Sequence, residues 1–227
     1  MINRSRENSV NNLQRIYTVV ISLAIAESLR RLFADFATSS VLPDLISVIA
    51  VTSLLITIIP FYHGANRYLD ARYVEAKHHG PSWSLMLDFV VIFVEGLIFF
   101  ILSLLIHNRA FFFTLLSILF IIDTLWVGLA SSQVDNDSDK KPSYLPWAIL
   151  NFTAAIIIYL TIWSNLFRVE TAGNYFLGIV VVTRTIVDYI SVWSFYYPPV
   201  EGDQYIMPIP RPAPPPQRKT TRKRKLK

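Results

Sequence analysis

Charged and polar residues of the kinds that hold or transfer protons interrupt the apolar stretches of this sequence. Residues 180–193 have the apolar and aromatic composition of a lipid-embedded segment, yet Arg184 and Asp188 lie in the middle. These two are four residues apart, so they can pair along one face of a helix. Together with polar residues of other apolar stretches they define a candidate polar core: Glu95, Asp123, Arg184, Asp188, Asp88, Glu27 and Asn151.

The acids of this candidate polar core outnumber its cations. Arg30 and Arg31 lie one helical turn from Glu27 and are expected to neutralise it locally. A charge at mid-bilayer costs about 2.5 to 3.5 kcal/mol on insertion scales, so the remaining groups should face protein or water. Some acids are therefore expected to keep a proton, or to be reached by water or a cation. These acids, which share one buried arginine, are Asp88, Glu95, Asp123 and Asp188.

Helix geometry predicts how these groups meet. Asp88 and Glu95 are seven residues apart and share one face. Asp88 has the alternative of extending to the cytoplasmic interface. We expect Arg184 to pair with Asp188 on its own helix, and with Glu95 or Asp123 across a bundle. Such a network serves either as a proton or cation path, or as a set of buried ions that fixes helix packing.

Six apolar stretches are expected to carry these residues across a membrane. Of the 227 residues, 53% are hydrophobic, which is typical of an integral membrane protein. Each stretch approaches the ~20 residues that a spanning helix needs. The predicted fold is an all-α bundle of six transmembrane helices within residues 16–197, between a cytoplasmic segment at 1–15 and a tail at 198–227. The predicted spans are 16–32, 43–62, 84–106, 110–130, 144–167 and 174–197.

The distribution of Lys and Arg predicts the orientation. Most of them lie in the amino terminus, the second and fourth loops and the tail, whereas the opposite side has only Arg30, Arg31, Arg109 and Arg168. The positive-inside rule then places both termini in the cytoplasm. We expect a multi-pass protein of the plasma membrane, or of the inner membrane if the chain is bacterial.

Other types of chemistry find little support. The chain has no cysteine, and its four histidines lack the spacing of metal ligands on a helix. With 7 glycines and no phosphate-binding loop, no nucleotide site is indicated. We therefore expect no metal, no cofactor and no enzymatic activity, although His63 or Asp70 could serve a lipid-modifying enzyme at the cytoplasmic face.

Two charged segments are expected outside the membrane. Residues 60–80 predict a cytoplasmic or interfacial helix with Tyr68 and Tyr73 at headgroup level. The tail joins a proline-rich stretch to a basic run and is expected to be disordered by itself. Its basic residues predict attraction to anionic lipid headgroups, while docking to a proline-recognising domain is an alternative and nucleic acid is not expected. These residues are Arg218, Lys219, Arg222, Lys223, Arg224 and Lys225.

The sequence favours two functions over the third alternative, the lipid-modifying enzyme. The first is a transporter or channel that moves protons or cations through the polar core. The second is a non-catalytic membrane subunit or scaffold that recruits a partner or anionic lipid through its basic tail. Either function is compatible with a homo-oligomer or with a membrane partner.

Overall fold

The computed structural model describes residues 2–34, 36, 40–75, 82–132, 145–163 and 170–197, and these form helices with short connections. Within these ranges there is no strand, so the predicted all-α class is confirmed. In chain order the elements are α1 (Ile2–Leu32), α3 (Leu45–Leu69), the π-helix η1 (Asp70–Val74), α4 (Ser82–Leu104), α5 (Arg109–Ser132), α6 (Leu145–Trp163), α7 (Glu170–Ser191) and α8 (Trp193–Tyr196).

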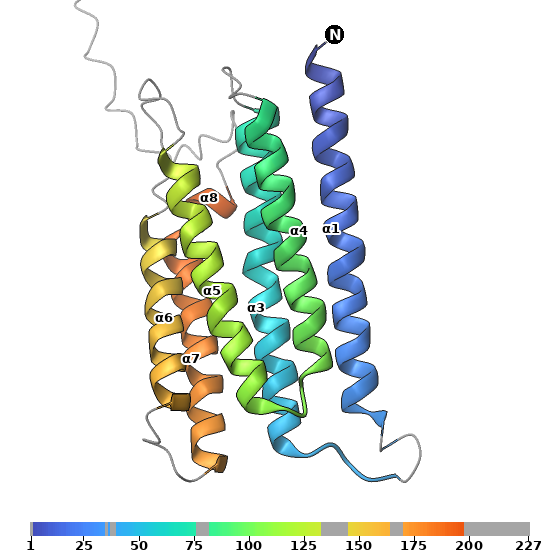
Figure 1. Ribbon diagram of the computed structural model, residues 1–227, viewed down its shortest axis with the longest axis vertical. Helices are drawn as coiled ribbons and strands as arrows, with labels where there is room; N and C mark the ends of the chain where they lie inside the picture. Colours follow the sequence, from blue (N-terminus) through green and yellow to red (C-terminus); the bar gives the residue numbers. More distant parts are fainter. Residues whose placement is uncertain are drawn as a thin grey trace, which may run out of the picture. The chain divides into compact units, whose positions relative to one another are not determined.

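The long helices lie side by side and alternate in direction (Figure 1). Helix α1 packs on α4, α5 on α6, and α7 on both α3 and α6. The short helix α8 follows α7 and returns to contact α3. The amino-terminal end of α1 and the α8 helix therefore lie at the same end of the bundle (Figure 1).

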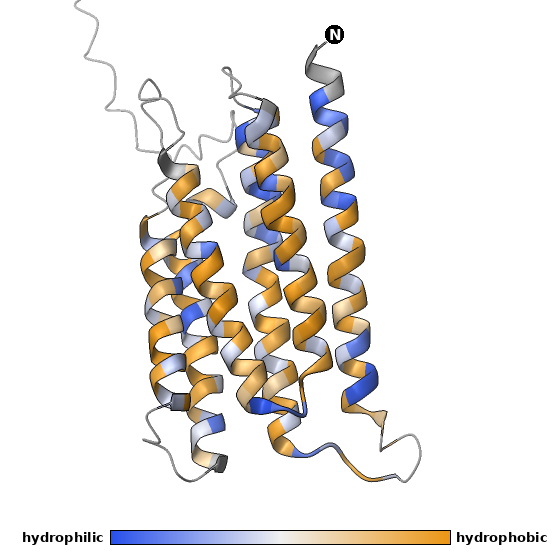
Figure 2. Ribbon diagram, in the orientation of Figure 1, coloured by the Kyte–Doolittle hydropathy of each residue, from blue (hydrophilic) through white to orange (hydrophobic). Residues whose placement is uncertain are grey.

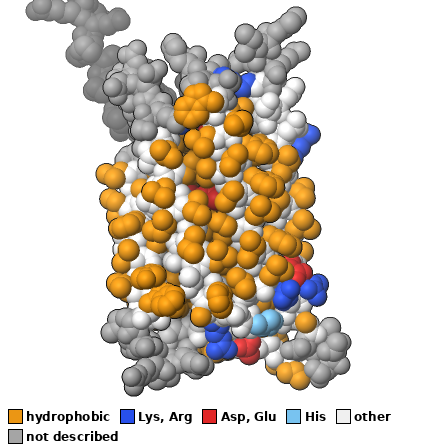
Figure 3. Space-filling view, in the orientation of Figure 1, with side chains coloured by type: hydrophobic (Ala, Val, Ile, Leu, Met, Phe, Trp, Pro, Cys, Tyr) orange, Lys and Arg blue, Asp and Glu red, His pale blue; other side chains and the backbone are white. Residues whose placement is uncertain are grey.

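Among the described residues, four segments are long and apolar enough to cross a membrane: Leu45–Val74, Trp83–Leu104, Arg109–Ala130 and Leu145–Trp163. Figure 2 shows hydrophobic residues along these helices, whereas the first half of α1 is hydrophilic. Hydrophobic side chains also cover the face of the bundle between its ends, as expected where helices contact lipid (Figure 3). Helices α1 and α7 coincide with the two other predicted spans but do not belong to this set of four.

Helix α3 extends beyond the predicted end of its span at residue 62. It continues to Leu69, and η1 carries the helical backbone to Val74. Tyr68 and Tyr73 are 2% and 1% exposed, so their rings are covered by protein, and their placement at headgroup level stays a prediction. The charged residues of this segment had predicted that it leaves the bundle, but the two aromatic rings pack inside the bundle.

Pro60 lies within α3 and leaves one backbone carbonyl of that helix free to bond with α7. Proline lacks a backbone N–H, so the carbonyl of Ile56 loses its usual donor from the next turn. The hydroxyl of Thr185, on α7, donates to this carbonyl at 3.4 Å. A neighbouring helix thus satisfies the group that proline leaves free, as is common in membrane helices.

Gly64, one turn further along α3, makes room for a large side chain of α6. A Cβ atom at this position would overlap the indole ring of Trp147. That ring is 2% exposed and lies between α3 and α8. Packing of the Trp147 ring against α3 therefore depends on the missing side chain.

Candidate polar network

Arg184 lies on the inner face of α7 and is 3% exposed. Its Nε donates a hydrogen bond to Oδ1 of Asn151, on α6, at 2.8 Å. Its guanidinium lies over two aromatic rings, 5.3 Å from the centroid of Phe61 and 5.2 Å from that of Phe120. The charge is thus held by an amide and by two ring faces, an arrangement that favours arginine over lysine.

Asp188 completes the predicted pair on α7. Nη1 of Arg184 lies 3.5 Å from Oδ2 of Asp188, which confirms the pairing expected from the four-residue spacing. The hydroxyl of Tyr196, on α8, donates to the same oxygen at 3.1 Å. Asp188 is fully buried, and α8 covers its carboxylate through this hydrogen bond.

Asn151 connects the pair to a second helix. Its Nδ2 donates to Oδ2 of Asp123, on α5, while its Oδ1 accepts from Arg184. The expected direct pairing of Arg184 with Glu95 or Asp123 does not form, because the amide of Asn151 lies between the arginine and Asp123. The sequence placed Asn151 in the polar core but gave no reason to expect it in this connecting position.

Glu95 and Asp123 bring two carboxyl groups together at the centre of the bundle. Glu95 comes from α4, and its carboxyl group interacts with that of Asp123. Each is 1% exposed. Two interacting carboxylates in a buried site repel each other when both are ionised, so we expect them to share at least one proton. The residues of α4, α5, α6 and α7 that form the connected polar network are Glu95, Asp123, Asn151, Arg184 and Asp188.

Asp88 belongs to a separate site and does not reach the interface. Its carboxylate, 4% exposed, accepts hydrogen bonds from Tyr73 Oη at 2.6 Å, Tyr68 Oη at 3.1 Å and Trp126 Nε1 at 2.9 Å. Arg72 Nη1 donates to the Tyr68 hydroxyl at 2.6 Å. The alternative that Asp88 extends to the cytoplasmic interface is therefore wrong, because three donors fix its carboxylate between α3, η1, α4 and α5.

Glu27 also lies outside the connected network. Its carboxylate pairs with Arg30 at 2.7 Å and with Arg31 at 2.6 Å, which confirms the predicted local neutralisation. These partners are on the same helix, α1, so Glu27 contributes no link to the polar network. Glu27 was predicted to belong to the polar core, but its pairs are local to α1 and it is not part of the connected network.

Three aromatic residues of the network were missed from the sequence. Tyr196 caps Asp188, while Phe61 and Phe120 bracket Arg184. Aromatic residues are common in every span of this chain, so no spacing distinguished these three. Their partners lie on other helices, and the pairing depends on how those helices pack.

His63 and Asp70 do not converge on a common site. The His63 ring stacks on that of Tyr196, with centroids 4.8 Å apart, and its Nδ1 lies 3.4 Å from the Tyr189 hydroxyl. Asp70 accepts a hydrogen bond from Gln14 at 3.0 Å.

The predicted lipid-binding residues of the tail lie outside the described residues. They are Arg218, Lys219, Arg222, Lys223, Arg224 and Lys225.

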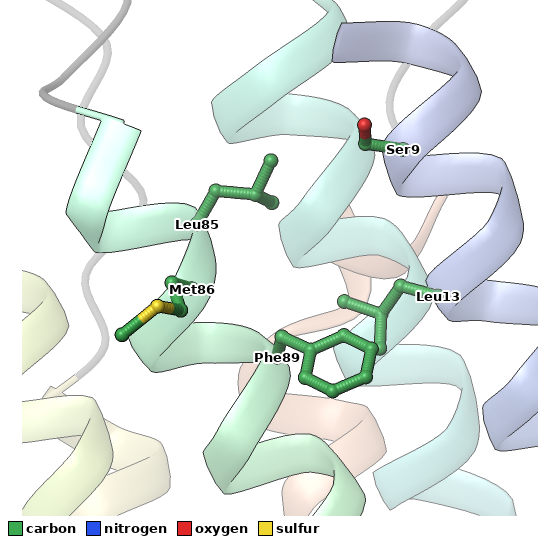
Figure 4. A pocket seen from close by; sticks show the side chains of 5 residues that line it. All are labelled: Ser9, Leu13, Leu85, Met86 and Phe89. Atoms are coloured by element: carbon green, nitrogen blue, oxygen red, sulfur yellow. The ribbon is translucent and has the colours of Figure 1, made fainter.

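Two surface grooves leave the polar network untouched. One, of about 240 Å³, lies between α1 and α4 and is lined by Ser9, Leu13, Leu85, Met86 and Phe89 (Figure 4). The other, of about 280 Å³, lies between α3 and α7 and has a largely apolar lining. Neither is lined by a residue of the network.

No protein-family model, curated protein or solved structure matches the chain.

Proposed function

We propose that this chain is a non-catalytic, multi-pass membrane protein that conducts protons through the polar network. Its bundle has six spans, with both termini in the cytoplasm of a cell whose plasma or inner membrane holds it. The observation that carries the proposal is the interaction of two buried carboxyl groups, those of Glu95 and Asp123, in the middle of an apolar bundle.

The packing of α1 and α7 supports six spans. Both helices run beside candidate spans, α1 against α4 and α7 against α3 and α6. The charges on α7 are turned inward, since Arg184 and Asp188 are buried, and this lowers their cost in lipid. Six crossings leave the two termini on one side, and the excess of Lys and Arg there favours the cytoplasm.

The composition of the polar network favours protons over metal ions. Within the described part of the chain, no group of three or more His, Asp and Glu side chains converges as a metal site. The network instead offers an acid pair suited to sharing a proton, and a third acid, Asp188, that an arginine and a tyrosine hydroxyl stabilise. Acids in unlike environments are the usual means of storing and releasing a proton in a membrane.

A scaffold or subunit role is the alternative, and one observation favours it. The charged groups of the polar network are nearly inaccessible, with Glu95 and Asp123 1% exposed and Asp188 fully buried. Buried ions of this kind can specify which helices pack together. In that case the basic tail would supply the function by binding anionic lipid or a partner, and the bundle would serve as its anchor or as part of an oligomer.

Proton flux in sealed liposomes tests the proposal. Native protein is compared with Glu95→Gln and Asp123→Asn, which keep size and hydrogen bonding but remove a titratable group. Asp44→Asn is the matched control, because Asp44 is half-exposed and pairs with Arg109 at a helix end. We expect both network variants to suppress the flux and the control to retain it.

The opposite result would favour the scaffold. Flux no greater than that of empty liposomes, with every variant folded, would sink proton conduction. Removal of residues 198–227 would then be expected to abolish binding of the protein in detergent micelles to vesicles containing anionic lipid, while leaving the bundle folded.

A further inference from the structure

Several buried polar atoms of the network, and the hydroxyl of Tyr17, have no hydrogen-bond partner among the described residues. They include donors as well as acceptors. The atoms are the hydroxyl of Tyr17, Oε1 of Glu95, Oδ1 of Asp123, Nη1 and Nη2 of Arg184, and Oδ1 of Asp188. Buried polar groups in proteins are almost always hydrogen-bonded, so a concentration of exceptions in one place indicates a ligand.

Tyr17 brings a fifth long helix, α1, to this place. Its side chain is 2% exposed, and its ring packs beside Gly96, the neighbour of Glu95 on α4. A Cβ at Gly96 would lie 3.2 Å from Cγ1 of Val20 and 3.4 Å from Cδ2 of Tyr17, so the missing side chain lets α1 pack closely on α4 at this level. Asp123 is joined to Arg184 through Asn151, and Arg184 pairs with Asp188, so most of the unpartnered atoms belong to residues that contact one another in succession.

The mixture of atoms defines the ligand class. A metal cation would use the carboxylate oxygens but would be repelled by the guanidinium of Arg184. An anion would accept from Arg184 and Tyr17 but would be repelled by the acids. Water both donates and accepts, and buried water molecules typically make about three hydrogen bonds to such groups. Water is therefore the one simple ligand that satisfies the whole group.

We propose that a cluster of internal water molecules occupies the core of the bundle, bounded by Tyr17, the Glu95 and Asp123 pair, and the Arg184 and Asp188 pair. Its role rests on the proposed function: the cluster carries protons between the acid pair and Asp188. Protein groups alone do not provide this path, because the Asn151 amide and the Arg184 guanidinium lie between the acids, and neither readily releases a proton.

Tyr17 provides a matched pair of substitutions. Its ring stacks on that of Tyr62, with centroids 5.8 Å apart and planes inclined by 19°. The Tyr62 hydroxyl lies 2.8 Å from the hydroxyl of Thr18, on the exposed side of α1. Tyr17→Phe and Tyr62→Phe each remove one hydroxyl from the same aromatic stack, but only Tyr17→Phe removes a group that bounds the water cluster.

Infrared spectroscopy of the full chain in liposomes tests the proposal directly. Spectra in ordinary water and in water labelled with oxygen-18 distinguish O–H stretches of bound water from those of the protein. We expect isotope-sensitive bands of internal water in the native protein and in Tyr62→Phe, with bands lost or shifted in Tyr17→Phe. Proton flux should fall severalfold in Tyr17→Phe and stay near native in Tyr62→Phe.

Three results separate this inference from the proposed function. No isotope-sensitive band in the native protein, or identical bands in all three proteins, would overturn the water cluster. Bands that depend on Tyr17, with no proton flux in any protein, would support the cluster and refute proton conduction. If Tyr17→Phe does not fold, Asp123→Asn replaces it and is expected to shift the same bands; unshifted bands there would also overturn the cluster.

Discussion

Replacing Arg184 by leucine should destabilise the bundle strongly, even though leucine is far better suited to a membrane. The substitution removes the hydrogen bond to Asn151, the ion pair with Asp188 and the contacts with two aromatic rings. It leaves Asp188 fully buried with one remaining donor, the hydroxyl of Tyr196. The dominant loss is therefore the uncompensated carboxylate rather than the lost contacts of the arginine.

The magnitude follows from this buried ion pair. Removing one partner of such a pair costs about 3 to 5 kcal/mol, which changes the folding equilibrium constant by a factor of about 100 or more. The double variant Arg184→Leu with Asp188→Asn removes the unpaired charge and keeps an acceptor for Tyr196. It should recover at least about 1 kcal/mol of this loss, as expected for residues in direct contact.

Reversible unfolding in mixed micelles, followed by circular dichroism, measures these differences. Arg109→Leu is the control, because Arg109 pairs with Asp44 at 3.4 Å near a helix end and is one-third exposed. This control should lose no more than about 1 kcal/mol. A cost below about 1 kcal/mol for Arg184→Leu, or a double variant less stable than the single one, would refute the reasoning.

Two further predictions use the same unfolding assay. Gly64→Ala should lose about 1 to 3 kcal/mol, because its Cβ would overlap the Trp147 ring, whereas Gly128→Ala has open space at its Cβ and should be neutral or more stable. Equal effects at the two glycines would contradict the packing. Trp126→Phe removes one of three donors to Asp88 and should cost about 1 to 3 kcal/mol. A loss no larger than that of Tyr62→Phe, whose hydroxyl is exposed, would show that the site does not depend on this donor.

Local spacing in the sequence was enough to determine several features. Apolar stretches of spanning length predicted an all-α fold, and four of the helices are long and apolar enough to span a membrane. Residues three or four apart on a helix necessarily lie on one face, so the Arg184 pair with Asp188 and the Glu27 pairs with Arg30 and Arg31 could be predicted.

Partners on different helices depended on the tertiary structure. The sequence placed Asp88 and Glu95 on one face of α4, yet Asp88 meets two tyrosines and a tryptophan, while Glu95 meets Asp123. Which acid receives which partner depends on the rotation and depth of the neighbouring helices. Those in turn depend on side-chain packing, as where Gly64 admits the Trp147 ring. Hydropathy fixes neither quantity, because lipid-facing and protein-facing apolar residues have the same composition.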